Sequence, residues 1–163
     1  MRNQKENTVR LLPTTKTKKA LENGYIKNVF DHGCASKNVI SCYVRPGDPK
    51  ELWLITEGEP KGAFASFRLR MPVITIHGVN SYRLSLEPDI INHMKSSGMK
   101  GVIVAFDADK HTNQAVLQYE QLLIDGLKEQ GIPLVMKAEW DESNGKGIDD
   151  NLASGGKVRF IPT

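Results

Sequence analysis

The stretch VIVAFDADK, residues 102–110, decides the fold. Its first five residues are all apolar, which is typical of a strand buried on both faces in the middle of a parallel sheet. Two aspartates, Asp107 and Asp109, follow where this strand ends. Because side chains alternate along an extended chain, positions two apart point the same way. The stretch therefore predicts a central strand that ends in a pair of carboxylates facing one side.

Strands and helices alternate along the chain on both sides of this stretch. Apolar segments that predict further strands lie at residues 52–55, 72–76 and 133–136. Apolar side chains at helical spacing, with Pro or Gly at the ends, predict helices at residues 60–69, 88–98 and 112–130. Such alternation indicates a parallel sheet with right-handed crossovers. We therefore expect an α/β fold, a compact Rossmann-like domain with a mostly parallel central sheet of about four strands flanked by helices.

The N-terminal third of the chain differs from the rest in charge. Residues 1–50 hold ten lysines and arginines against four acidic residues, whereas residues 51–163 hold twelve against fifteen. The turn RPGDP at residues 45–49 suggests a boundary. We expect residues 1–49 to form a basic arm with a short α/β appendage, and residues 50–163 to form the main domain. Such an arm suits a polyanion held near a metal centre, although lysines that only aid solubility explain it equally well.

The composition indicates a protein that works in the cytoplasm. No apolar run approaches the ~20 residues that a membrane span needs, and the N-terminus lacks the apolar stretch of a secretory signal. We therefore expect no membrane partner. The two cysteines are expected to stay reduced. A zinc site on His32, Cys34 and Cys42 is conceivable, but a structural zinc site needs a fourth ligand and none lies nearby.

A third acidic residue, Glu57, follows the first predicted strand within TEGEPKG. The carboxyl ends of parallel strands meet at one edge of a sheet, so Glu57, Asp107 and Asp109 can converge. Converging carboxylates repel one another unless a cation joins them, and oxygen ligands suit Mg²⁺, with Mn²⁺ as an alternative. A glutamate left unliganded can act as general base or acid. The alternative is that Glu57 and Asp109 only cap the helices at residues 60–69 and 112–130.

Two of these segments carry a resemblance to a known family. WLITEGEPKGAF at residues 53–64 and VIVAFDADK resemble the two signature motifs of Toprim domains, which occur in bacterial-type primases, topoisomerases and OLD-type nucleases. HGVNSY at residues 77–82 and GKGIDDNLASG at residues 145–155 look closer still to the Toprim-like domains of primase and primase-helicase proteins of plasmids, phages and other mobile elements. The resemblance covers about residues 50–155.

The resemblance implies a role for each matching residue. Glu57 matches the catalytic glutamate, and Asp107 and Asp109 match the metal-binding carboxylates, so that all three would be catalytic and would surround Mg²⁺. Lys61 matches a lysine one turn into the first helix, where it would approach a phosphate. One departure is the absence of the glycine that follows the aspartate pair in classical primases, because Lys110 stands there.

The terminal motif implies a further group near the acidic cluster. Lys146 would bind substrate or phosphate, and Asp149 and Asp150 would support the carboxylates or the metal. The alternative is that Asp149 or Asp150 caps a short helix at residues 150–154. Glu59 matches no family role and is expected to cap a helix.

The resemblance favours an enzyme: a Mg²⁺-dependent nucleotidyl or phosphoryl transferase that makes primers during DNA replication, like a primase. Its partners would be single-stranded DNA or another nucleic acid, NTPs and a helicase or other replication protein. The chain has no GxxxxGK(S/T) stretch and no zinc ribbon, so it would be a minimal protein, a subunit or a fragment. Alternatives are a Toprim nuclease that activates water, a non-catalytic DNA- or replisome-binding module, and a phosphoacceptor receiver domain.

Overall fold

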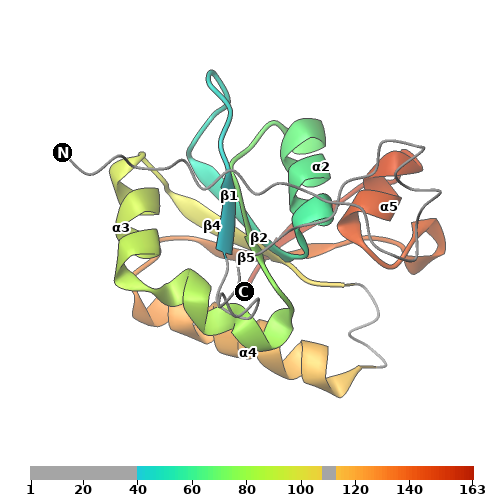
Figure 1. Cartoon of the computed structure of the whole chain (residues 1–163). Coiled ribbons are helices and arrows are strands. Elements are labelled where there is room, and N and C mark those ends of the chain that lie inside the picture. Colours follow the sequence, from blue (N-terminus) through green and yellow to red (C-terminus); the bar gives the residue numbers. More distant parts are fainter. Residues whose placement is uncertain (1–39, 108–112) are drawn as a thin grey trace, which may run out of the picture. The chain divides into compact units, whose positions relative to one another are not determined.

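Four parallel strands form the centre of the sheet in the computed structural model, which describes residues 40–107 and 113–163 (Figure 1). They are β2 (Leu52–Glu57), β3 (Val73–Ile76), β4 (Gly101–Ala105) and β5 (Val135–Glu139). Each pairs in parallel with its neighbours in the order β3-β2-β4-β5. The expected α/β fold with a mostly parallel sheet flanked by helices is therefore confirmed.

Two antiparallel strands widen the sheet to six. β1 (Ile40–Tyr43) pairs with β3 at one edge, and β6 (Arg159–Pro162) pairs with β5 at the other. The apolar stretch VISCYV at residues 39–44 predicts a strand, which corresponds to β1, whereas no sequence pattern predicts β6. β6 has four residues and ends in Pro162, so its sequence shows little sign of a strand. Proline within sheets is confined to edge strands and strand ends, which fits the place of β6 at the edge. β1 belongs to this sheet although it precedes residue 45, and the division at residues 45–49 stays a prediction.

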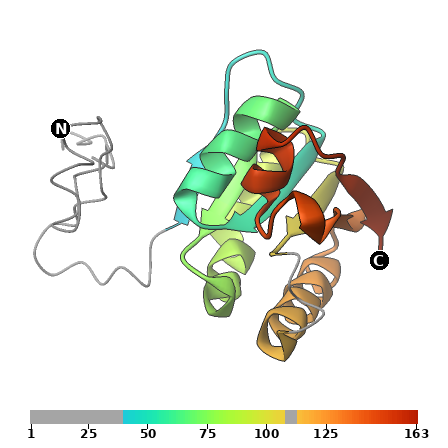
Figure 2. The ribbon, with the colours of Figure 1, turned by 90° about the vertical axis from the view of Figure 1, so that its right-hand side faces the viewer.

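The helices form two layers, one on each face of the sheet (Figures 1 and 2). α2 (Glu59–Leu69) and α5 (Ile148–Ala153) cover one face, where Ala65 and Leu152 pack against Leu54 and Ile103. The opposite face carries α3 (Pro88–Ser96), α4 (Gln114–Glu129) and the 3₁₀ helix η3 (Val79–Leu86). None of the helices in the described residues is long and apolar enough to span a membrane.

The chain leaves the two middle strands in opposite directions. From β2 it runs through α2 to β3 on one side, and from β4 it runs through α4 to β5 on the other side. The sheet therefore changes its winding direction between β2 and β4. In open α/β sheets, ligands bind beyond the carboxyl ends of the strands at such a switch point. The fold alone directs attention to the residues that follow β2 and β4.

Helix α2 lies very close to β3 at Gly62. A Cβ atom at this position would lie 1.9 Å from Thr75 Cγ2 and 3.3 Å from Val73 Cγ1. Thr75 and Val73 are buried strand residues and cannot move away easily. The small residue therefore sets how closely α2, which carries part of the candidate site, approaches the sheet.

Gly62→Ala is expected to lower the free energy of unfolding by about 1–3 kcal/mol through overpacking, measured by urea denaturation. Thr75→Ser removes the methyl group that the added Cβ would meet. The double variant should therefore lose less stability than the sum of the losses in the two single variants. If Gly62→Ala instead raised stability by the ~1 kcal/mol that helix propensity favours, the close packing would be refuted.

Candidate functional site

Glu57 and Asp107 lie at the carboxyl edge of the sheet, at the switch point. Glu57 is the last residue of β2, and Asp107 follows two residues after the end of β4. Thr56, just before Glu57, pairs with Ala105 and also donates a side-chain hydrogen bond of 2.8 Å to its carbonyl oxygen. This pairing holds the two strand ends side by side. Asp107 is 7% exposed, so its charge needs a partner.

Lys61 supplies that partner. It lies in the first turn of α2 at position i+4 from Glu57, and its ammonium contacts both Asp107 Oδ1 and, at 3.4 Å, Glu57 Oε1. The side chain is only 25% exposed, so the contact is shielded from solvent. The cation thus joins two carboxylates that come from different strands.

Lys146 adds a second positive charge from the C-terminal part of the chain. Its Nζ lies 3.6 Å from Asp107 Oδ2, and its side chain is 57% exposed. Asp107 therefore has a lysine at each carboxylate oxygen. The prediction that Lys146 lies near the acidic cluster agrees with this geometry, and the phosphate-binding role of Lys61 and Lys146 stays a prediction.

The segment after Lys146 packs tightly against Lys61. A Cβ atom at Gly147 would lie 3.2 Å from Lys61 Cε and 2.3 Å from Asp149 Oδ1. Glycine at this position lets Lys61 and the start of α5 share one small space. Asp149 Oδ1 is buried and has no hydrogen-bond partner among the described residues. Asp149 thus lies at the site with one oxygen available, whereas Asp150 is exposed.

The surroundings raise the pKa of both Glu57 and Lys61, for different physical reasons. Burial raises the pKa of Glu57 above its ordinary value, and the charge of Asp107 raises it further against the lowering effect of Lys61. Burial alone would lower the pKa of Lys61, but its hydrogen bond to Asp107 and the two carboxylate charges outweigh burial and raise that pKa. A carboxyl that holds its proton more firmly beside a fixed cation suits acid–base chemistry.

The capping alternatives do not describe these carboxylates. The residue before α2 is Gly58, which makes no side-chain cap, and Gly147 before α5 makes none either. Asn113 caps α4, because its side chain accepts a hydrogen bond from the Val116 amide. Glu59 lies in the first turn of α2, and Asp149 and Asp150 lie in the first turn of α5.

Some predicted residues lie outside the described part of the chain. These are Asp109, Lys110 and residues 1–39, which make up most of the basic arm. His32 and Cys34 of the conceivable zinc site belong to the same stretch. Cys42 is described and is a free thiol on β1. Within the described residues, no group of three or more Asp, Glu, His or Cys side chains could hold a metal ion. Glu57, Asp107 and Asp149 could each offer a single oxygen ligand, but among the described residues they do not together form a metal-binding group.

A second polar group beside the site escaped the sequence analysis. Glu59 is buried, accepts a 2.6 Å hydrogen bond from the Ser41 hydroxyl, and lies 4.0 Å from His77 Nε2. These residues come from α2, β1 and the end of β3. Only the antiparallel pairing of β1 with β3 brings Ser41 to this edge, and local sequence carries no sign of it.

The fold and the site define an α/β protein whose charged residues gather at the switch point of its sheet. Comparison with family models matches residues 50–158 to the family described as Domain of unknown function (DUF3854). The chain therefore belongs to this family. No curated protein and no solved structure matches the chain.

Lys61→Met is expected to lower the free energy of unfolding by about 1–3 kcal/mol at neutral pH, because it leaves Asp107 and Glu57 without their shielded cation. Urea denaturation in metal-free buffer measures this loss. Adding Asp107→Asn to Lys61→Met should recover part of it, since the buried charge is then gone.

Lys146→Met is the matched control, because it removes a cation from the same carboxylate at a more exposed position. We expect a loss of at most about 1 kcal/mol, as for other exposed ion pairs. Equal losses in the two lysine variants would contradict the central place of Lys61.

Proposed function

We propose that this protein is a Mg²⁺-dependent nucleotidyl transferase of the Toprim type that makes primers on single-stranded DNA, in the manner of primases. The observation that carries the proposal is the convergence of Glu57 and Asp107 at the switch point, with Lys61 between them. The resemblance of the motifs around these residues to Toprim motifs supports the same reaction class. NTPs and a DNA template would be the substrates, with the basic arm near the template.

The donor set of the site suits Mg²⁺. Mg²⁺ prefers oxygen ligands and keeps several waters, so one or two protein carboxylates suffice when substrate phosphates complete the shell. Asp107 supplies one carboxylate, and the proposal assigns the other to Asp109. The buried, unpartnered oxygen of Asp149 is a further acceptor that water bound to a metal could satisfy. The bound ion would supply charge neutralisation at the transferring phosphoryl group.

Each charged side chain has a task in the transfer step. The 3′-hydroxyl oxygen of the growing strand attacks the α-phosphorus of the NTP, a new P–O bond forms, and pyrophosphate leaves as the α–β bond breaks. Glu57 accepts the proton of the hydroxyl, which its raised pKa favours. Lys61 and Lys146 hold phosphate oxygens, since both ammonium groups already lie at the acidic edge. In a nuclease, water would replace the hydroxyl.

The first test of the proposal is metal binding. The full chain is expected to bind Mg²⁺ or Mn²⁺ in calorimetric titrations, and Asp107→Asn and Asp109→Ala should each weaken binding at least about ten-fold. Asp125→Asn is the control, because Asp125 is an exposed carboxylate on α4 away from the strand ends. Absence of binding by the unmodified chain to either ion would refute the metal-dependent reaction.

The second test is NTP incorporation on single-stranded DNA. We expect Glu57→Gln to slow incorporation by about a hundred-fold or more while metal affinity changes little, as for loss of a general base. Metal-dependent cleavage of DNA without synthesis would instead assign a nuclease. If Asp107→Asn abolished metal binding yet left DNA affinity and biological activity unchanged, a non-catalytic binding module would be the better account.

A further inference from the structure

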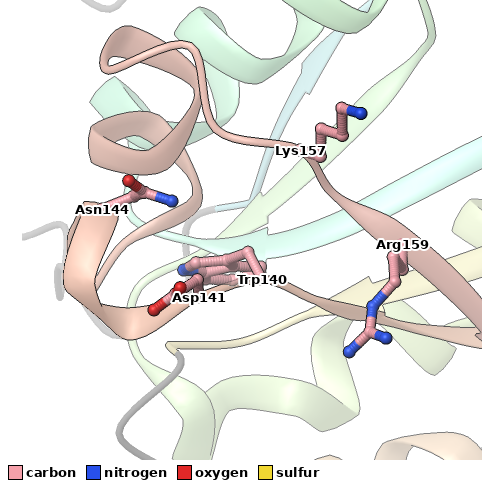
Figure 3. A pocket seen from close by; sticks show the side chains of 5 residues that line it. All are labelled: Trp140, Asp141, Asn144, Lys157 and Arg159. Carbon is pink, nitrogen blue, oxygen red and sulfur yellow. The ribbon is translucent and has the colours of Figure 1, made fainter.

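A pocket of about 500 Å³ lies at the same edge of the sheet, beyond β5 (Figure 3). It is lined by Trp140, Asp141, Asn144, Lys157 and Arg159. We call it the Trp140 pocket. Figure 3 shows Trp140 in the middle of the group, with Asp141 and Asn144 on one side and Lys157 and Arg159 on the other. Its volume falls in the range of about 300–1,000 Å³ that small-molecule sites have.

The indole ring of Trp140 is held in place. Its Nε1 donates a 3.1 Å hydrogen bond to the Gly145 carbonyl oxygen, and the ring packs partly against the buried cluster beneath α5. The remaining ring surface lines the pocket. An immobilised aromatic face loses little conformational entropy when a flat ligand stacks on it.

Two cations and two hydrogen-bonding groups surround this ring. Lys157 and Arg159 are exposed on the segment that leads into and begins β6, and they can bind phosphate oxygens. Arg159 Nη2 also lies 3.7 Å from Glu139 Oε2, but the arginine side chain is 76% exposed, so the guanidinium stays accessible. Asn144 and Asp141 offer amide and carboxylate groups on the opposite side. A flat aromatic body with polar edges and an attached phosphate matches this set of groups.

The Trp140 pocket is connected to the acidic site through one short segment. Trp140 Nε1 binds the carbonyl of Gly145, and the next residue, Lys146, reaches Asp107. β5 also pairs in parallel with β4, so Trp140 and Asp107 both follow the carboxyl ends of neighbouring strands. Adjacent strands are about 4.8 Å apart, which is within the length of one nucleotide.

We infer that the Trp140 pocket binds one nucleotide unit, with the base stacked on Trp140, its polar edge toward Asn144 and Asp141, and phosphate bound by Lys157 and Arg159. The occupant is a free nucleoside triphosphate or the end of a single strand, since both present the same chemistry. Its meaning as a substrate site rests on the proposed function, but the binding itself does not.

The test uses the full chain in EDTA, with ATP, a four-residue oligothymidylate and inorganic tripolyphosphate as probes. Calorimetry gives affinities, and tryptophan fluorescence reports stacking, because the other tryptophan, Trp53, is fully buried. ATP or the oligonucleotide is expected to bind and quench fluorescence, and whichever binds more tightly identifies the source. Tripolyphosphate is expected to bind more weakly than ATP, since it lacks the base.

Trp140→Ala is expected to weaken binding about ten- to hundred-fold, the range found for loss of base stacking. Trp140→Phe keeps an aromatic face, so affinity should stay within a few-fold while the quenching disappears. Lys157→Gln with Arg159→Gln changes only exposed side chains and should weaken ATP binding at least about ten-fold, whereas adenosine binding should not change. Lys100→Gln is the charge control, because Lys100 is exposed at the opposite end of β4.

The inference is overturned if neither ATP nor the oligonucleotide binds, if the exposed double variant leaves ATP affinity unchanged, or if Trp140→Phe leaves the quenching unchanged. Equal affinity for tripolyphosphate and ATP would also overturn it, as phosphate alone would then explain binding. These titrations contain no divalent metal and need no turnover. Nucleotide binding without NTP incorporation would therefore uphold the pocket and count against the proposed reaction. NTP incorporation without nucleotide binding at the Trp140 pocket would uphold the reaction and count against the pocket.

Discussion

The parallel pairing of β2 with β4 is the constraint on which the rest of the structure depends. It joins two strands whose chains depart in opposite directions, so no crossover helix in the described part of the chain covers the carboxyl edge between them. Trp53–Ile55 and Val102–Val104 are fully buried in this pair, which leaves little freedom to shift its register. A slip of one residue would turn every side chain to the other face, and Glu57 and Asp107 would no longer share Lys61.

Lys61 shows how the chain itself balances the charges that this pairing brings together. Two partly buried carboxylates repel each other, and the ammonium between them offsets part of that cost. In the proposed reaction the same cation has a second use. The side chain of lysine is a long flexible stem on a Cα fixed by α2, so its charge can move from the carboxylates to an arriving phosphate. Mg²⁺ would then replace the Lys61 ammonium beside the carboxylates, so that their negative charges would stay balanced.

Sequence patterns revealed the centre of the fold better than its edges. The fully apolar run at residues 102–106 and the regular alternation around it carry a strong local signal, so the order of strands and helices was predictable. Strand β6 and the pairing of β1 are decided by contacts between distant segments, which no local pattern records. The same holds within the site. Glu57 and Asp107 were predictable from strand ends, whereas the contact between Ser41 and Glu59 and the pocket around Trp140 required the folded chain.

The contacts made between Trp140 and Asp149 account for the glycine–lysine–glycine sequence at residues 145–147. Trp140 fixes the Gly145 carbonyl, Lys146 then extends to Asp107, and Gly147 is small enough to admit Lys61 and Asp149 beside it. A ligand stacked on Trp140 would press on the same segment that positions Lys146. Because the Lys146 side chain is 57% exposed, a change in its position costs less than it would for a buried lysine. If the Trp140 pocket binds a nucleotide as inferred, its occupation and the charge at Asp107 would be coupled through Gly145 and Lys146.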